Sequence, residues 1–378
     1  MGETAASMFN TTLISAALLV IVLVLHWFKN IYFKNKIYIA RGSLPAITLL
    51  LFFYLWMMVS LLYTPSPTYS YFKTFLFLTN LVAFFFPLFY KDFDFQRAIK
   101  YFIYFGTVFI VLYLIVVPRS YSNIAEDLEI SVKYLDMGFL SALNVMFLLL
   151  PHSCPALGRW LKLSLMGVNL AALVITGARG PLVFMILVLV LYVFFHPRHL
   201  SRFLGRWTIK KILAVAISLV ILVVGLYYTL ANYTEKIALN LERFSKVLDV
   251  DSSSLSVRFS QIYFALETIF HDATNFLIGT GIGSFGILYE GEDIRLYPHN
   301  MILETWFEMG AVGVFLLTLF FLFYLKKVKR YDPSVYIFFY LLLNSLKSYT
   351  LVDLRVMFGI LACLVVFANR REYGEYAE

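Results

Sequence analysis

Three residues combine cationic or titratable side chains with positions at the ends of apolar stretches: Arg179, Arg258 and His299. A guanidinium group forms paired hydrogen bonds with phosphate oxygens, and a neutral imidazole accepts a proton near neutral pH. If the fold brings these groups together, they form an anion site with a general base. The three are therefore the candidate catalytic residues, with Arg179 and Arg258 as the candidate ligands of a phosphate group.

Each of the three also has an ordinary structural explanation. An arginine at a span end can extend to the membrane surface, a charged residue can lie on a solvated helix face, and a histidine can be a simple interface group. Two observations favour the anion site. All three lie on the face that the positive-inside rule depletes of cations, and Gly177, Gly180 and Pro181 interrupt the apolar run around Arg179 and expose backbone N–H groups.

The segment that begins at His299 predicts how the histidine is held. Pro298 suits the first turn of a helix, and Asn300, Glu304 and Glu308 share one helix face at four-residue spacing. Nearby positive charge and a helix N-terminus both disfavour the imidazolium, so the ring is expected to be neutral. Acids inside an apolar span need hydrogen bonds or a polar cavity. We therefore expect Asn300, Glu304 and Glu308 to hold the site residues in position without contacting the substrate.

Other motifs do not indicate a cofactor. Gly281-Ile-Gly-Ser-Phe-Gly286 has the letters of a dinucleotide motif, but it follows an amphipathic helix on the outer side of the membrane, which predicts a tight turn instead. The acidic pairs 92–94 and 249–251 have no histidine at metal-ligand spacing. The sequence predicts neither a required metal nor a cofactor.

The elements that position these residues are membrane helices. The chain of 378 residues is 61% hydrophobic and only 14% charged, and its apolar runs repeatedly reach spanning length. We expect an all-α, polytopic integral membrane protein with about eleven spans, within a range of about 10–12. The expected spans are residues 11–28, 46–63, 72–90, 101–118, 134–151, 160–175, 181–196, 211–230, 300–325, 335–351 and 355–368.

Charge sets the expected orientation. Lysine and arginine gather in alternate loops, at residues 29–41, 91–100, 159–162, 198–211, 326–330 and 370–371. The positive-inside rule makes these loops cytoplasmic, so the N-terminus is expected outside and the C-terminus inside. The net charge of +8 then reflects topology, and nucleic-acid binding is not needed to explain it.

The long hydrophilic stretch 231–298 is expected to be an outer loop inserted between spans of one integral membrane domain, 1–378. Within it, residues 256–270 carry apolar side chains at the three-and-four spacing of an amphipathic helix. Such a helix would lie on the outer membrane surface or cover a cavity.

These segments resemble the bacterial O-antigen ligase and O-antigen polymerase superfamily of membrane glycosyltransferases. The resemblance rests on Thr176-Gly-Ala-Arg-Gly-Pro, Ser256-Val-Arg-Phe with Phe276-Leu-Ile-Gly-Thr-Gly-Ile-Gly-Ser-Phe, and His299-Asn-Met-Ile-Leu-Glu-Thr-Trp-Phe-Glu-Met-Gly-Ala-Val-Gly. It covers about residues 170–325, and the earlier spans match only in character.

The resemblance implies a bacterial inner-membrane enzyme of lipopolysaccharide biosynthesis with its site on the periplasmic face. Such an enzyme moves a glycan from undecaprenyl diphosphate to an acceptor by an inverting, metal-independent route. The same resemblance implies that the phosphate group expected at Arg179 and Arg258 is this diphosphate. Transfer to lipid A–core, as in a ligase, is the first expectation. Polymerisation onto a second carrier-linked glycan is the alternative. A transporter or flippase for an anionic lipid-linked substrate is a further alternative; it predicts inverted repeats or broken helices in corresponding halves, and the sequence shows neither.

Overall fold

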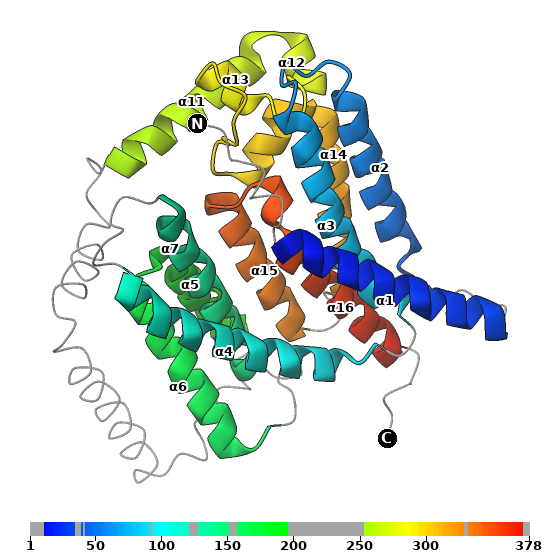
Figure 1. Ribbon diagram of the computed structural model, residues 1–378, viewed down its shortest axis with the longest axis vertical. Helices are drawn as coiled ribbons and strands as arrows, with labels where there is room; N and C mark the ends of the chain where they lie inside the picture. Colours follow the sequence, from blue (N-terminus) through cyan, green and yellow to red (C-terminus); the bar gives the residue numbers. More distant parts are fainter. Residues whose placement is uncertain are drawn as a thin grey trace. The chain divides into compact units, whose positions relative to one another are not determined.

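The computed structural model describes residues 11–34, 39–40, 42–90, 93–120, 128–150, 157–195, 253–328 and 332–372. The regular elements in these ranges are helices, which confirms the all-α fold class (Figure 1). They fall into two compact units: residues 1–98 with 253–378, and residues 99–252. The expected single domain and the boundaries of the expected outer loop stay predictions.

The first unit contains the two ends of the chain and the second contains the middle. The first unit holds α1 (Thr11–Lys34), α2 (Leu44–Ser60), α3 (Tyr69–Phe89), α11 (Ser253–His271), α12 (Ala273–Ile278), α13 (Phe285–Tyr289), α14 (Met301–Val328), α15 (Asp332–Lys347), η4 (Leu351–Asp353) and α16 (Arg355–Glu372). The helices α4 (Phe95–Ser120), α5 (Leu128–Leu149), α6 (Arg159–Ile175) and α7 (Arg179–Phe195) follow one another, and all but the first residues of α4 belong to the second unit.

The described helices fit a multi-pass membrane protein. Three of them are long and apolar enough to cross a membrane by length and composition: Tyr69–Phe89, Phe95–Ile115 and Met301–Lys326. Shorter apolar helices occupy Ile14–Lys29, Leu44–Ser60, Leu135–Leu149, Arg179–Phe195, Val335–Lys347 and Arg355–Val366. The expected span 211–230 and the first part of the expected outer loop, 231–252, lie outside the described residues.

In the first unit, α3 packs along α16 and α2 packs along α14. Aromatic side chains form the centre of this packing. The Phe320 ring lies 5.5 Å from the rings of both Phe84 and Phe358, edge to face with the first and stacked on the second. Such ring pairs favour one arrangement of neighbouring helices over others, so they fix α3, α14 and α16 against one another.

The helix α14 is broken at Gly310, where φ is 65° and ψ is −169°. The expected span 300–325 therefore coincides with α14, but the helix is interrupted and not continuous. A Cβ atom at Gly310 would lie 2.3 Å from the carbonyl oxygen of Leu277, so only glycine allows this approach. The break leaves carbonyl groups without partners inside the helix, and the segment after α12 donates hydrogen bonds to them. The N–H groups of Thr280 and Gly281 donate to the carbonyls of Phe307 and Glu308, at 2.8 and 2.9 Å.

The glycine-rich segment 281–286 is a tight turn, as the sequence predicts. Gly281 and Gly283 have φ values of 96° and 74°; the first lies against the loop that joins α2 to α3, and the second lies against the start of α3. A Cβ atom at Gly281 would meet the backbone of Thr64 at 2.4 Å. The glycines therefore allow two backbones to approach closely, which is a structural use of the motif.

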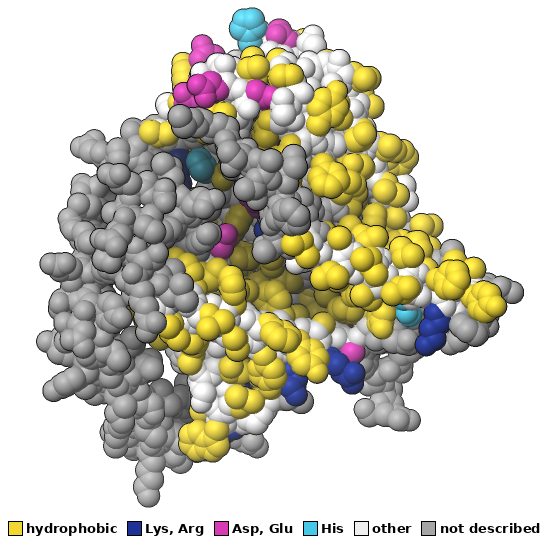
Figure 2. All heavy atoms as spheres, viewed as in Figure 1, with side chains coloured by type: hydrophobic (Ala, Val, Ile, Leu, Met, Phe, Trp, Pro, Cys, Tyr) yellow, Lys and Arg dark blue, Asp and Glu magenta, His cyan; other side chains and the backbone are white. Residues whose placement is uncertain are grey.

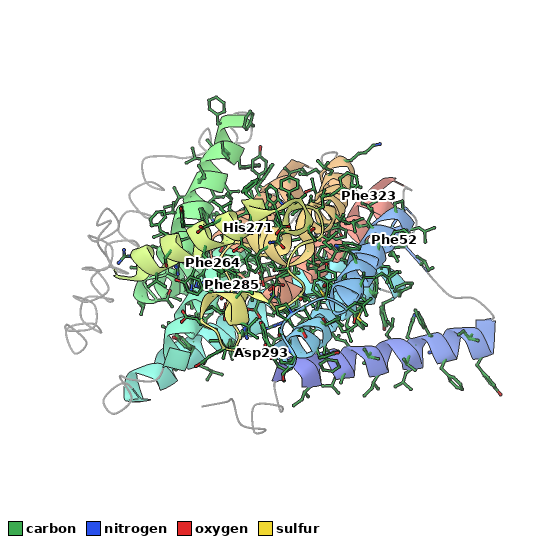
Figure 3. All side chains as sticks on the ribbon, turned by 90° about the horizontal axis from the view of Figure 1, so that it is seen from above. Phe52, Phe264, His271, Phe285, Asp293 and Phe323 are labelled. Carbon is green, nitrogen blue, oxygen red and sulfur yellow. The ribbon has the colours of Figure 1, made fainter. Side chains whose placement is uncertain are left out.

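The amphipathic helix expected at 256–270 is present as α11, and its apolar side chains divide between the protein core and the surface. Ala265 and Ile269 are buried against α13 and α14. Phe259, Tyr263 and Phe270 are instead 60–69% exposed. The small side chain of Ala265 permits close packing on α14, and the larger apolar side chains face outward. Figure 3 shows Phe264 of this helix beside Phe285 of α13, with rings 5.9 Å apart.

The second unit is held together by a buried polar chain. Asn144 of α5 donates to the side-chain oxygen of Asn169 in α6 at 3.0 Å, and Asn169 donates to the hydroxyl of Thr107 in α4 at 2.8 Å. A polar network inside an apolar bundle fixes the helix register, because misalignment leaves buried groups without partners. The same unit carries Gly177, which turns the chain with a φ of 63° immediately before α7.

Candidate active site

The site is built at the start of α14. Asn300 caps this helix: its side-chain oxygen accepts hydrogen bonds from the N–H groups of Ile302 and Leu303, both at 3.0 Å. This capping uses two of the free N–H groups at a helix start. Pro298 is buried immediately before the histidine. The local sequence thus fixes where the helix begins and where the His299 backbone lies.

His299 has a strained backbone. Its φ of 52° is the one positive value at a non-glycine residue among the described residues. A side chain in this left-handed region is disfavoured, and such residues persist where surrounding contacts hold them. Here the ring of Tyr297 packs edge to face on the imidazole, with centroids 4.7 Å apart. The left-handed backbone at His299 therefore gives its side chain a different direction from that of a residue with helical dihedral angles.

The imidazole of His299 is neutral at pH 7. Burial, followed by the positive charge of Arg258, lowers the pKa of His299 to about 4. Its Nδ1 atom is buried and has no hydrogen-bond partner within the described residues. A neutral imidazole with an unused nitrogen can accept a proton from a bound hydroxyl group.

Arg258 lies on α11, on the side of the helix that approaches the start of α14. It is half-buried, and its charge lowers the pKa values of both His299 and Tyr297. The structure therefore brings two of the three predicted site residues together. Their meeting depends on the packing of α11 on α14, in which Ala265 and Ile269 contact Leu303 and Phe307.

Arg179 is the first residue of α7 and belongs to the second unit. It is half-buried and follows the turn at Gly177. The expected interruption is present at Gly177, whereas Gly180 and Pro181 lie in the first turn of α7. Its place beside Arg258 and His299 stays a prediction.

An ion pair beside the histidine was not predicted. Arg295 Nη2 lies 2.5 Å from Asp353 Oδ2 of η4, and the Arg355 guanidinium lies 3.8 Å from the same carboxylate. Burial, followed by the charge of Asp353, raises the pKa of Tyr297 to about 12, so its phenol remains a hydrogen-bond donor. The ion pair joins the segment before His299 to the turn between α15 and α16. Adjacent sequence could not reveal it, because its partners are 58 residues apart.

Lys73 of α3, a residue that the sequence analysis did not identify, contacts the first turns of α14. Its ammonium contacts the carboxylates of Glu304 and Glu308, at 2.5 and 2.6 Å, and all three side chains are fully buried. Glu304 and Glu308 thus share a face of α14, as their spacing predicts, and they have a cationic partner. The available signal was a lysine inside the expected span 72–90, since an ionisable residue within a span calls for a partner.

Charge is distributed unevenly along the first unit. Figure 2 shows acidic side chains gathered at the end that carries α12 and α13, and apolar side chains covering the flank. Asp272, Glu290 and Asp293 lie in or beside these elements, and Lys326 lies near the far end of α14. Among the described residues, no group of three or more His, Cys, Asp or Glu side chains is placed to hold a metal ion.

Residues 164–318 match the O-antigen ligase family. The match confirms the resemblance to the O-antigen ligase and polymerase superfamily, and it includes Arg179, Arg258, His299, Glu304 and Glu308. Among curated proteins, none matches the chain. The matched region lies in an apolar, multi-helix chain, which is consistent with a multi-pass membrane protein, and the match supports a function of the ligase or polymerase kind in general.

Proposed function

We propose that this protein transfers a glycan from undecaprenyl diphosphate to the lipid A–core acceptor, as an O-antigen ligase of the bacterial inner membrane. The observation that carries the proposal is the pairing of Arg258 with a neutral His299 at the start of a membrane helix, within the O-antigen ligase family region. A base and a fixed cation at one point are what glycosyl transfer from a diphosphate requires.

The reaction assigns each group a task. An acceptor hydroxyl oxygen attacks the anomeric carbon, and the bond from that carbon to the diphosphate oxygen breaks with inversion. His299 takes the hydroxyl proton. The departing diphosphate gains negative charge, so Arg258 and Arg179 stabilise the transition state more than the bound donor. No step requires a metal ion, and the proposed mechanism is metal-independent.

The proposed orientation puts this chemistry on the periplasmic side. The acids Asp272, Glu290 and Asp293 lie in or beside α12 and α13, and α13 packs on the first turns of α14 through Phe285 and Phe307; Lys326 lies near the C-terminal end of α14. This asymmetry supports a periplasmic site and a cytoplasmic end of α14 by the positive-inside rule. The N-terminus is then periplasmic and the C-terminus cytoplasmic.

Polymerisation is the second candidate function, because it uses the same donor and the same base. Only the acceptor differs: a carrier-linked glycan replaces lipid A–core. The family match covers both activities at this level, so the acceptor must be identified by experiment.

A transporter or flippase would draw support from the break in α14, since interrupted helices commonly form substrate sites in transporters. The carbonyls freed at this break are not directed into a substrate site. Those of Phe307 and Glu308 accept from the chain's own N–H groups, and that of Met309 accepts from the Trp56 indole at 2.9 Å. The break therefore joins α14 to neighbouring segments, which gives no support to a transporter site.

The test supplies purified protein in lipid nanodiscs with an undecaprenyl-diphosphate glycan, in three arms: lipid A–core, no second acceptor, and His299→Ala protein with lipid A–core. Glycan attached to lipid A–core supports the ligase. Lengthened carrier-linked glycan in the second arm identifies a polymerase. Donor that crosses the bilayer without forming a new glycosidic bond would contradict both enzymes and support the flippase.

A further inference from the structure

A buried charged cluster joins α3 and α14 inside the apolar part of the first unit. It consists of Lys73, Glu304 and Glu308, whose side chains have no exposed surface. The Lys73 ammonium contacts one oxygen of each carboxylate, at 2.5 Å for Glu304 and 2.6 Å for Glu308. We call these three residues the Lys–Glu–Glu cluster.

The two carboxylates have unequal surroundings. Glu304 accepts two further hydrogen bonds, from the Thr350 hydroxyl at 2.5 Å and from the Leu351 N–H at 2.8 Å. Its two oxygens therefore have three donors. Besides Lys73, Glu308 has the Gly283 N–H group nearby, but its Oε2 atom is buried and has no hydrogen-bond partner within the described residues. Glu304 is surrounded as a carboxylate requires, whereas Glu308 is not.

The cluster carries one ammonium against two carboxyl groups. The other charged or titratable groups close to the cluster do not supply a second positive charge. Tyr69 of α3 supplies a neutral ring 5.9 Å from the Lys73 ammonium, and Arg295 is already paired with Asp353 at 2.5 Å. A single uncompensated carboxylate inside an apolar region is strongly unfavourable, and such a group takes up a proton instead.

We propose that the Lys–Glu–Glu cluster is a proton-binding site in which Glu308 is a neutral carboxylic acid and Glu304 is ionised. The cluster then has no net charge. Lys73 and Glu304 form the ion pair, and protonated Glu308 accepts a hydrogen bond from Lys73 through its Oε1 atom. This inference goes beyond glycan transfer and is independent of the proposed function.

The neutral cluster has a positioning role. Through Lys73 and Glu304 it joins the first turns of α14 to α3 and to the turn at Thr350 and Leu351. His299 lies directly before these turns. The Lys73–Glu304 ion pair and its hydrogen bonds resist sliding between helices, because any displaced register leaves buried charges unpaired.

The test compares two matched substitutions in the full chain. Glu308→Gln replaces a neutral acid by a neutral amide of the same shape, so we expect a melting temperature within about 3 °C of the unchanged protein. In Glu304→Gln, Glu308 becomes the only counter-charge of Lys73 and must ionise without the Thr350 and Leu351 donors that Glu304 has, so the melting temperature is expected to fall by about 10 °C. Equal losses for the two substitutions would show that both carboxyl groups are ionised and would overturn the proposal.

Infrared spectroscopy in nanodiscs gives a readout that does not depend on stability. A protonated carboxyl has a C=O stretch above the amide region, and it shifts in heavy water. We expect one such band at pH 7 in the unchanged protein and its loss in Glu308→Gln. In Glu304→Gln, Glu308 is the remaining counter-charge of Lys73 and ionises, so the band is expected to disappear there too. Absence of the band in the unchanged protein, or a band that neither substitution removes, would overturn the assignment.

A further arm separates a proton from a small metal cation. Melting is measured in sodium chloride and in choline chloride at equal ionic strength. We expect equal melting temperatures in the two salts. A sodium-dependent rise that Glu308→Gln abolishes would assign the site to a monovalent cation and overturn the proton.

Discussion

Replacing Arg258 by methionine should move the pH dependence of transfer in a calculable direction. The base must be neutral to accept a proton, so transfer falls as pH drops through the pKa of His299. In the unchanged protein, this acid limb is expected at about pH 4, because burial and Arg258 lower the pKa from its ordinary 6.5 to about 4.

The expected size of the movement follows from the order of the two causes. Burial is the larger and Arg258 the smaller. Methionine keeps most of the apolar volume of the arginine side chain but removes its charge, so burial remains. The acid limb should therefore rise above 4 while staying in the lower half of the interval between 4 and 6.5.

The assay is the rate of glycan transfer against pH, with each profile normalised to its own plateau because loss of Arg258 also weakens donor binding. Carbon NMR of labelled imidazole in nanodiscs reports the same pKa directly. Arg97→Met is the matched control, since this arginine is 73% exposed and pairs with Asp94 at the start of α4. An acid limb that stays in place, or moves to lower pH, would refute the assignment of Arg258 as the cation beside His299.

The remaining predictions concern the candidate site residues, the dependence on metal, and the structure of α14. His299→Ala, Arg179→Ala and Arg258→Ala should each lower transfer by at least about 10²-fold and leave the protein folded in membranes, and a variant with unchanged transfer would remove its residue from the site. Chelation by EDTA should leave transfer unchanged; loss that a divalent ion restores would mean that the mechanism requires a metal. Gly310→Ala should lower the yield of folded protein, because the new Cβ would lie 2.3 Å from the Leu277 carbonyl, whereas Gly291→Ala has a similar φ of 78° and no neighbour within 4 Å, so a larger loss in Gly291→Ala would contradict the clash. Asn300→Ala should destabilise the protein by about 1 kcal/mol through loss of the helix cap, measured by thermal unfolding with Asn275→Ala as a control outside α14.

The sequence predicted the helices better than their contacts. Spans such as 72–90 and 335–351 correspond to α3 and α15 within a few residues, because apolar length is a local property. The amphipathic helix at 256–270 was also correct. The sequence did not show which of its side chains contact α14, because the close packing of Ala265 depends on a distant segment.

The site was predictable in part for the same reason. His299 and its cap Asn300 are neighbours in sequence, and both were identified. Lys73 was missed because its partners lie 231 and 235 residues away. The break at Gly310 was missed because its cause is the backbone of Leu277. Such features depend on distant segments that no local pattern records.

The break in α14 limits how the outer segment can move. The stretch from Ile278 to Ser284 is joined to the helix by backbone hydrogen bonds at Phe307 and Glu308, and to the loop before α3 by the Tyr63 hydroxyl, which donates to the Ile278 carbonyl at 2.7 Å. Lifting this stretch would uncover bare peptide groups within the bundle. A movement that opens the unit to a large substrate would therefore have to occur outside this stretch.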